Sequence, residues 1–372
     1  MGLNVGGMNE ALRGKIVRAV DVGYGNVKYA FKHDDAFRDV ECDLFPSRSI
    51  LAGDKGLENE LSQSYDTIIV HVNGTNYEVG KDIAKAQATN DESTILDMQF
   101  CLTDAYLARF RGALYYMNGF DPSNKSVRLI PGNRIDHMVV GLPVATAKNN
   151  DLRVKLAERL VGVHPLPDNR TVEIGEVTVL PQPVGALFEY AFEEGMFNTM
   201  KDQKSLVVDI GFNTYDWLVT DGMKPNYKRS DCVNRGMSAV IKAIADEAKR
   251  KENWTASTGM LTRMLDDYFR MAKPFIVYGE EYDVSEYLAT TRPVINEAVA
   301  QMVNSVGDGA DIQNIVLTGG GAQVYYDAVK ERFPRHKIAI RNRPVFSNVR
   351  GYQLYGEQKM LNQLRQERKE SV

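Results

Sequence analysis

Val20-Asp21-Val22-Gly23-Tyr24-Gly25-Asn26-Val27-Lys28 joins two apolar, β-rich runs through a turn that contains two glycines. Short runs of this kind around such a turn predict a β-hairpin. Gly23 and Gly25 can let backbone N–H groups turn inward as an anion-binding nest. Lys28 can point its charge at the same place, and Asp21 can hold a hydrated Mg²⁺. Taken alone, the stretch favours a plain hairpin whose glycines serve only the turn.

The same order of residues returns in the second half of the chain, at Val207-Val208-Asp209-Ile210-Gly211-Phe212-Asn213-Thr214-Tyr215-Asp216. Two such loops facing each other across a cleft can clamp the phosphates of one nucleotide, with Asp21 and Asp209 converging on its metal. The alternative is that Asp209 and Asp216 only form turns. The repetition at matching places in two halves favours the nucleotide interpretation over this alternative.

A third glycine-rich turn lies in Ile315-Val316-Leu317-Thr318-Gly319-Gly320-Gly321-Ala322, where a buried strand is predicted to run into a helix. Backbone without side chains at the carboxyl end of a strand permits close approach of a ligand. The triplet is followed by Gln323 and Val324, so it does not match the dinucleotide pattern GxGxxG. A tight strand-to-helix connection is the structural alternative.

Composition limits the class of protein. The 372 residues suffice for two domains, and the net charge of -4 with a pI near 5.9 argues against direct, strong nucleic-acid binding. The three cysteines are far apart, which fits neither a zinc site nor a disulfide framework. The sequence has no apolar stretch long enough to span a bilayer and no signal-peptide pattern at its start. We therefore expect a cytoplasmic protein with no membrane partner.

Alternating strands and helices with local hairpins predict a mixed α/β fold. The periodicity predicts a helix over 97–117, a buried strand at Met138–Leu142 and a helix at Val184–Phe197. Residues 362–372 are expected to form a charged, frayed tail.

The order of the three glycine-rich turns resembles the phosphate 1, phosphate 2 and adenosine motifs of the actin-like ATPase superfamily. Within it, the first turn and the segment Phe346–Tyr352 resemble the ParM/StbA family of bacterial and plasmid actin-like proteins. The resemblance extends from Ile16 to about Gly356. It implies an actin-like α/β fold with two RNase H-like domains around a nucleotide cleft. Residues 1–14 would be a flexible leader, residues 15–183 with 346–372 domain I, and residues 184–345 domain II.

The resemblance also implies roles for individual residues. Gln182, in a segment similar to the family's first interdomain connection, would orient the attacking water, and with Asp209 it would be catalytic. Asp21 and Asp209 would hold Mg²⁺ through water. Nucleotide would be bound by residues of all three turns: Asp21, Gly23, Tyr24, Gly25, Asn26, Lys28, Gly211, Phe212, Asn213, Thr214, Gly319, Gly320 and Gly321. Two residues depart from the family pattern, because Phe212 stands where many relatives have glycine and Tyr24 replaces the small hydroxyl residue of actin.

The function implied is an ATPase that polymerises into filaments and segregates plasmid DNA through a DNA-binding adaptor protein. Its cofactors would be ATP, with GTP left open, and Mg²⁺, and its main partner would be further copies of itself. Two alternatives remain: a small-molecule kinase of the same superfamily and an ATP-binding scaffold that does not polymerise. A kinase usually needs a carboxylate base beside the γ-phosphate, whereas the amide of Gln182 cannot accept a proton.

Overall fold

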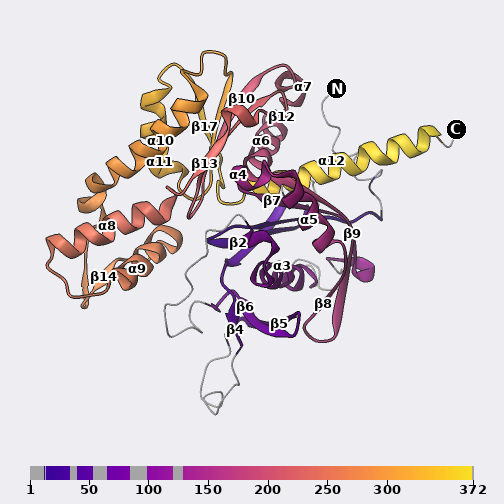
Figure 1. Ribbon diagram of the computed structural model, residues 1–372, viewed down its shortest axis with the longest axis horizontal. Helices are drawn as coiled ribbons and strands as arrows, with labels where there is room; N and C mark the ends of the chain where they lie inside the picture. Colours follow the sequence, from indigo (N-terminus) through magenta and orange to yellow (C-terminus); the bar gives the residue numbers. More distant parts are fainter. Residues whose placement is uncertain are drawn as a thin grey trace, which may run out of the picture. The chain divides into compact units, whose positions relative to one another are not determined.

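The computed structural model describes residues 12, 14–33, 40–52, 65–83, 99–119 and 129–370 (Figure 1). The chain divides into two compact units, one built from residues 1–197 with 346–372 and the other from residues 198–345. Each unit has its own main sheet with helices packed on it, which confirms the mixed α/β class. Of the expected leader at residues 1–14, only residues 12 and 14 lie within the described part.

The sheet of the first unit has six strands in the order β3-β2-β1-β7-β9-β8. The strand β1 pairs antiparallel with β2 and parallel with β7, which in turn pairs parallel with β9. The strands are β1 Val17–Val22, β2 Asn26–His33, β3 Val40–Pro46, β7 Arg134–Leu142, β8 Gly162–Leu166 and β9 Arg170–Pro181. A smaller sheet, of order β4-β6-β5, is formed by β4 Ile50–Leu51, β5 Thr67–Val72 and β6 Thr75–Gly80.

Helices cover both faces of this first sheet. The helices α3 Asp104–Met117 and α5 Asn150–Leu160 share a core with Met138 and Val140 of β7. The helix α12 Ser347–Glu370 packs on the opposite face, where its Gly356 lies against Val17 and Val139. Because β7 is buried on both faces, its apolar residues run continuously instead of alternating with polar ones.

The sheet of the second unit repeats this arrangement, in the order β12-β11-β10-β16-β17. Again a central strand, β10, pairs antiparallel with its hairpin partner β11 and parallel with a later strand, β16. The strands are β10 Lys204–Ile210, β11 Tyr215–Asp221, β12 Lys224–Pro225, β16 Asn314–Thr318 and β17 Ile338–Ile340, with β13 Asp231–Val233 pairing to β11. The larger helices are α8 Met237–Lys251, α9 Thr258–Met271, α10 Arg292–Val306 and α11 Ala322–Arg332.

Three expected elements differ in their bounds. The helix expected over 97–117 begins at Asp104, because the Thr103 side chain caps it by accepting a hydrogen bond from the Tyr106 amide; a short 3₁₀ turn, η2 Phe100–Leu102, precedes it. The expected frayed tail is wrong over its described part, since α12 stays helical to Glu370.

The third differing element is α6, which runs over Gln182–Glu193 instead of 184–197. It crosses α12 at two glycines: a Cβ on Gly351 would lie 1.7 Å from the carbonyl oxygen of Gly185. Only glycine permits two helix backbones to approach this closely. The sequence placed a domain boundary at 183/184, whereas the compact first unit includes α6 and extends to Phe197, because α6 packs on α12.

Candidate functional site

The hairpin β1–β2 carries a buried ion pair. Asp21 is 0% exposed, and the ammonium of Lys28, its partner across the two strands, donates a hydrogen bond to Asp21 Oδ2 at 2.9 Å. The loop between them is closed by the Gly23 amide, which donates to the Asn26 carbonyl at 3.1 Å. The Ser47 amide donates to the Gly25 carbonyl and ties the loop to the end of β3. The position of the carboxylate is therefore fixed by the sheet and by an opposite charge.

The first loop is the plain hairpin turn that the stretch by itself favours, and not an anion-binding nest. Neither Gly23 nor Gly25 is among the glycines with positive φ, and the Gly23 N–H is used to close the turn. Alternating right- and left-handed residues are what turn successive N–H groups toward an anion. This loop is a tight hairpin turn beside a charged pair.

Gln182, the first residue of α6, joins this pair from a distant part of the chain. Its side-chain amide Nε2 donates to Asp21 Oδ1 at 2.7 Å, so Asp21 accepts from Lys28 on one oxygen and from Gln182 on the other. The backbone carbonyl of Gln182 accepts a hydrogen bond from the hydroxyl of Tyr352 at 3.1 Å. The structure thus brings Asp21, Lys28 and Gln182 together and adds Tyr352.

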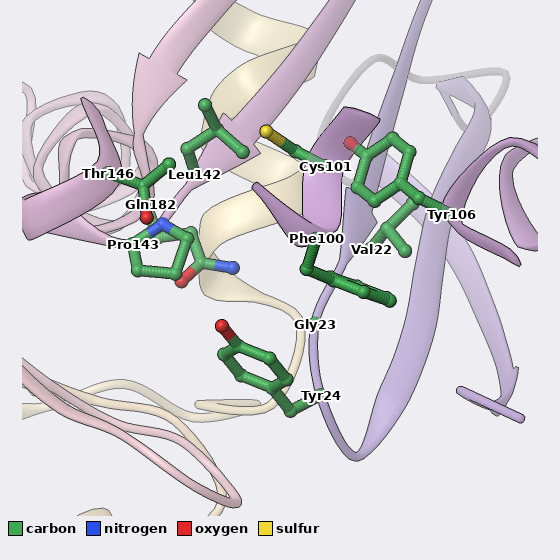
Figure 2. Close-up of a pocket in the computed structure, with 10 residues that line it drawn as sticks. All are labelled: Val22, Gly23, Tyr24, Phe100, Cys101, Tyr106, Leu142, Pro143, Thr146 and Gln182. Carbon is green, nitrogen blue, oxygen red and sulfur yellow. The ribbon is translucent and has the colours of Figure 1, made fainter. Parts of the chain in front are cut away.

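A small hollow beside Gln182 completes this part of the first unit (Figure 2). Its volume of about 20 Å³ is room for about one water molecule. The ring of Tyr24 stacks on Phe100 with centroids 5.7 Å apart, and Figure 2 shows its hydroxyl pointing toward the amide of Gln182. The lining residues are Val22, Gly23, Tyr24, Phe100, Cys101, Tyr106, Leu142, Pro143, Thr146 and Gln182. Tyr24 is therefore an aromatic wall of the hollow and packs against a second ring.

Several of these lining residues were missed by sequence reasoning. Phe100, Tyr106 and Thr146 come from a 3₁₀ turn and two helices, and no motif in the sequence relates them to the hairpin. Burial, together with Cys101 and Asp21 nearby, raises the pKa of Tyr106 well above its usual range. Its phenol therefore stays protonated at neutral pH.

The hairpin β10–β11 of the second unit has the same turn but a different charge pattern. The Gly211 amide donates to the Thr214 carbonyl at 2.9 Å, as Gly23 does to Asn26. Asp209, which is 6% exposed, lies directly opposite Asp216 on the neighbouring strand. Two buried carboxylates thus share one face of this hairpin.

The first turn of α8 is docked on this loop. The amides of Gly236, Met237 and Ser238 donate to the carbonyls of Asn213, Gly211 and Phe212 respectively. These bonds satisfy backbone donors that a helix start leaves unpaired. A Cβ on Gly236 would lie 2.7 Å from three backbone atoms of the loop, which makes Gly236 a site residue that sequence reasoning missed. Phe212 packs against the apolar core of the unit.

The glycine triplet after β16 lies beside Asp209, because Thr318 pairs with Asp209 in the parallel ladder. Gly319 has φ +83°, and a Cβ there would lie 2.5 Å from Asp209 Oδ1. The Gly321 amide donates to the Ile210 carbonyl at 3.0 Å, whereas a Cβ on Gly320 would make only an ordinary contact, 3.9 Å from the Val345 side chain. The two predicted glycine turns of the second unit therefore meet at one edge of its sheet.

Within the described residues, no group of three or more His, Cys, Asp or Glu side chains is arranged to hold a metal ion. A divalent cation at either hairpin would need ligands from water or from a bound phosphate as well as from the carboxylates. In the same part of the chain, no helix is both long and apolar enough to cross a bilayer.

Two family models match the chain. Residues 19–185 match the N-terminal domain of actin-like proteins, and residues 207–331 match the C-terminal domain of archaeal, MreB-like actin homologues. In sequence, the chain matches no curated protein. The two models together include both hairpins, Gln182 and the glycine triplet.

Solved structures with the same fold cover nearly the whole chain at low identity. An archaeal actin homologue in complex with ADP is 19% identical, with 92% of this chain and 99% of that one covered and a TM-score of 0.65. A subunit of a 15-stranded ParM filament from Clostridium botulinum is 20% identical, with 92% and 99% covered and a TM-score of 0.67. The apo psk41 ParM protein is 21% identical, with 94% and 98% covered and a TM-score of 0.65. The expected actin-like fold is thereby confirmed.

Proposed function

Because the chain belongs to the actin-like proteins, we propose that it is an ATPase that polymerises into nucleotide-dependent filaments. The observation that carries this proposal is the bonded set Lys28–Asp21–Gln182, in which an amide is held beside the first glycine turn. The repetition of the turn in the second unit supports a nucleotide as the ligand.

The residues fit a magnesium-bound triphosphate chemically. Buried carboxylates at the ends of β1 and β10 offer oxygen ligands, and Lys28 offers a positive charge for phosphate oxygens. Asp21 already accepts two hydrogen bonds, so it would hold a hydrated ion through water; Asp209 would do the same from the second unit. The ion, when bound, would neutralise phosphate charge. Gly319, Gly320 and Gly321 would let the base and ribose lie close to the backbone, which suits ATP and leaves GTP possible.

Gln182 would orient the attacking water. Its Nε2 is held by Asp21, which fixes the plane of the amide and leaves Oε1 to accept a hydrogen bond from water. The hollow next to it has room for about one water molecule. An amide positions water without taking its proton, which favours hydrolysis over transfer to a bound acceptor by general-base catalysis.

The proposals about assembly and cargo are based on the similar solved structures. Two of the similar structures are filaments, the ParM filament of Clostridium botulinum and the Alp12 filament. Head-to-tail contacts between identical subunits that do not close into a ring produce such open polymers. We propose the same for this chain, with hydrolysis timing disassembly. The acidic net charge of -4 favours a DNA-binding adaptor over direct contact with plasmid DNA.

The test is sedimentation of the purified protein with Mg²⁺ and ATP, ADP or a slowly hydrolysed ATP analogue, alongside phosphate release. We expect polymer above a threshold concentration with ATP, more stable polymer with the analogue, and release of phosphate in parallel. Protein that binds ATP yet stays in the supernatant with both triphosphates would contradict the filament proposal. Phosphate transfer to a small acceptor, found by screening candidate compounds, would favour the kinase.

A further inference from the structure

Tyr352 of α12 is buried in a slot made by glycines of two other elements. Its side chain is 0% exposed, and a Cβ on Gly141 of β7 would lie 2.1 Å from its hydroxyl oxygen. A Cβ on Gly185 of α6 would lie 2.6 Å from its ring. The ring fits only because both neighbours lack side chains, so its place is strictly determined by packing.

The hydroxyl of Tyr352 donates its hydrogen bond to the first residue of α6. The acceptor is the backbone carbonyl of Gln182, at 3.1 Å, while the side chain of the same residue donates to Asp21 at 2.7 Å. Gln182 is thus held at both ends, by β1 through its side chain and by α12 through its backbone. A side-chain amide points where the backbone that carries it allows, so both bonds determine its direction.

We propose that Tyr352 is a positioning residue for Gln182: it fixes the first turn of α6 so that the amide keeps the orientation needed to align water. This inference rests on the proposed hydrolysis at Gln182. Tyr352 lies behind Gln182 and acts through it, without touching nucleotide. Small errors of placement in a water-orienting group lower turnover and leave substrate binding intact.

Tyr352→Phe is the direct test, because it keeps the ring in its slot and removes only the hydroxyl. We expect kcat to fall about fivefold, which corresponds to the loss of one ordinary hydrogen bond. The Kd for ATP should stay within about twofold of the wild-type value. In a Gln182→Ala background the same change should lower kcat no further, because Tyr352 would then have nothing left to position.

A matched control is Tyr287→Phe in the second unit. Tyr287 is 1% exposed, and its hydroxyl donates at 3.1 Å to Oε1 of Glu252, the C-cap of α8, at the opposite end of that helix from the turn docked on the glycine loop. This variant also loses one hydrogen bond of a buried tyrosine, so it should lose comparable stability while keeping wild-type kcat.

The outcomes distinguish a failure of this inference from a failure of the proposed hydrolysis at Gln182. Normal turnover in Tyr352→Phe with slow turnover in Gln182→Ala overturns the role of Tyr352 alone. An additional fall in the double variant, or a parallel loss of ATP affinity in Tyr352→Phe, also overturns it, because the tyrosine would then act elsewhere. Normal turnover in Gln182→Ala instead contradicts the proposed water-orienting role, and the inference fails with it.

Discussion

The two glycine hairpins have the same backbone and opposite cross-strand charges. In both, the amide of the first glycine closes the turn onto the carbonyl three residues later, and an aspartate lies two residues before that glycine. Across the strands, Asp21 faces Lys28, whereas Asp209 faces Asp216. A repeated fold thus presents a neutralised carboxylate in one unit and two carboxylates side by side in the other.

This difference indicates that Asp21 and Asp209 have different roles, although they occupy the same place in the same motif. Asp21 is compensated within the protein, so its clearest role is to hold Gln182 and Lys28 in place. Like charges directly opposite on neighbouring strands destabilise a sheet unless other groups compensate them. A divalent cation bound at the Asp209–Asp216 hairpin would reduce the repulsion between the two carboxylates, so we expect changes at Asp209 to alter the dependence on Mg²⁺.

The largest expected difference is in stability without nucleotide or metal. Asp21→Ala leaves the largely buried ammonium of Lys28 without its carboxylate, and we expect a loss of about 3 kcal/mol in the free energy of unfolding. Asp209→Ala should cost less, because removing that carboxylate also removes a like charge directly opposite Asp216. Urea titrations of both variants measure the difference, and equal losses would contradict the proposed contrast between the hairpins.

The next effect concerns hydrolysis and metal. We expect Asp209→Ala to lower kcat about hundredfold and to raise the Mg²⁺ concentration needed for half-maximal rate. Asp21→Ala, assayed where it is still folded, should instead weaken ATP binding at least about tenfold. Phosphate release across a Mg²⁺ titration, with ATP binding measured separately, checks both. Unchanged ATP affinity in Asp21→Ala would remove the phosphate 1 role.

Gln182→Ala sharpens the comparison within the first unit. Its amide is expected to contribute mainly in the transition state, so we predict turnover at least about tenfold slower with nearly unchanged ATP affinity. Slower hydrolysis should also lengthen the lifetime of polymers. Single-turnover kinetics and sedimentation measure the two effects, and a fall in affinity equal to the fall in rate would indicate a binding role instead.

The smallest expected effect is that the two units unfold at different pH values in acid. Burial lowers the pKa of His137, on β7, to about 4, against the opposing effect of Glu176 and with a smaller lowering effect of Lys359. In the unfolded chain the imidazole therefore binds a proton near pH 6.5, whereas in the folded chain it does so only near pH 4. The free energy of unfolding consequently falls as the pH drops from about 6.5 to about 4. The expected loss is about 1 kcal/mol at pH 6.

In the second unit, hydrogen bonds from Arg229 and Lys204 lower the pKa of Asp311. Its contribution to stability is present above the unfolded pKa of about 3.8 and is lost only as the pH falls below that value. Both tryptophans, Trp217 and Trp254, belong to the second unit, so their fluorescence reports on it alone. Far-UV circular dichroism should therefore change at higher pH than fluorescence, and His137→Gln should reduce the gap. Coincident transitions that this variant leaves unchanged would contradict the role of His137.

The local parts of the site were predictable because they are encoded over short distances. A strand, an aspartate, a glycine turn and a second strand occupy consecutive residues, so both hairpins followed from the sequence. The left-handed Gly319 likewise lies where the triplet ends a strand. The nest that Gly23 and Gly25 would permit is not formed, because glycine permits positive φ without requiring it.

The sequence by itself determined two α/β halves, their matching turns and the residue types available to bind a nucleotide, because these depend on neighbours along the chain. Only the tertiary structure decided what each charged group faces. It placed Lys28 against Asp21, brought Gln182 to them from a distant helix, and fitted Tyr352 between Gly141 and Gly185. The physical reason is that register and close packing arise between segments far apart in sequence. The role of a glycine therefore depends on which residues lie against it in the folded chain.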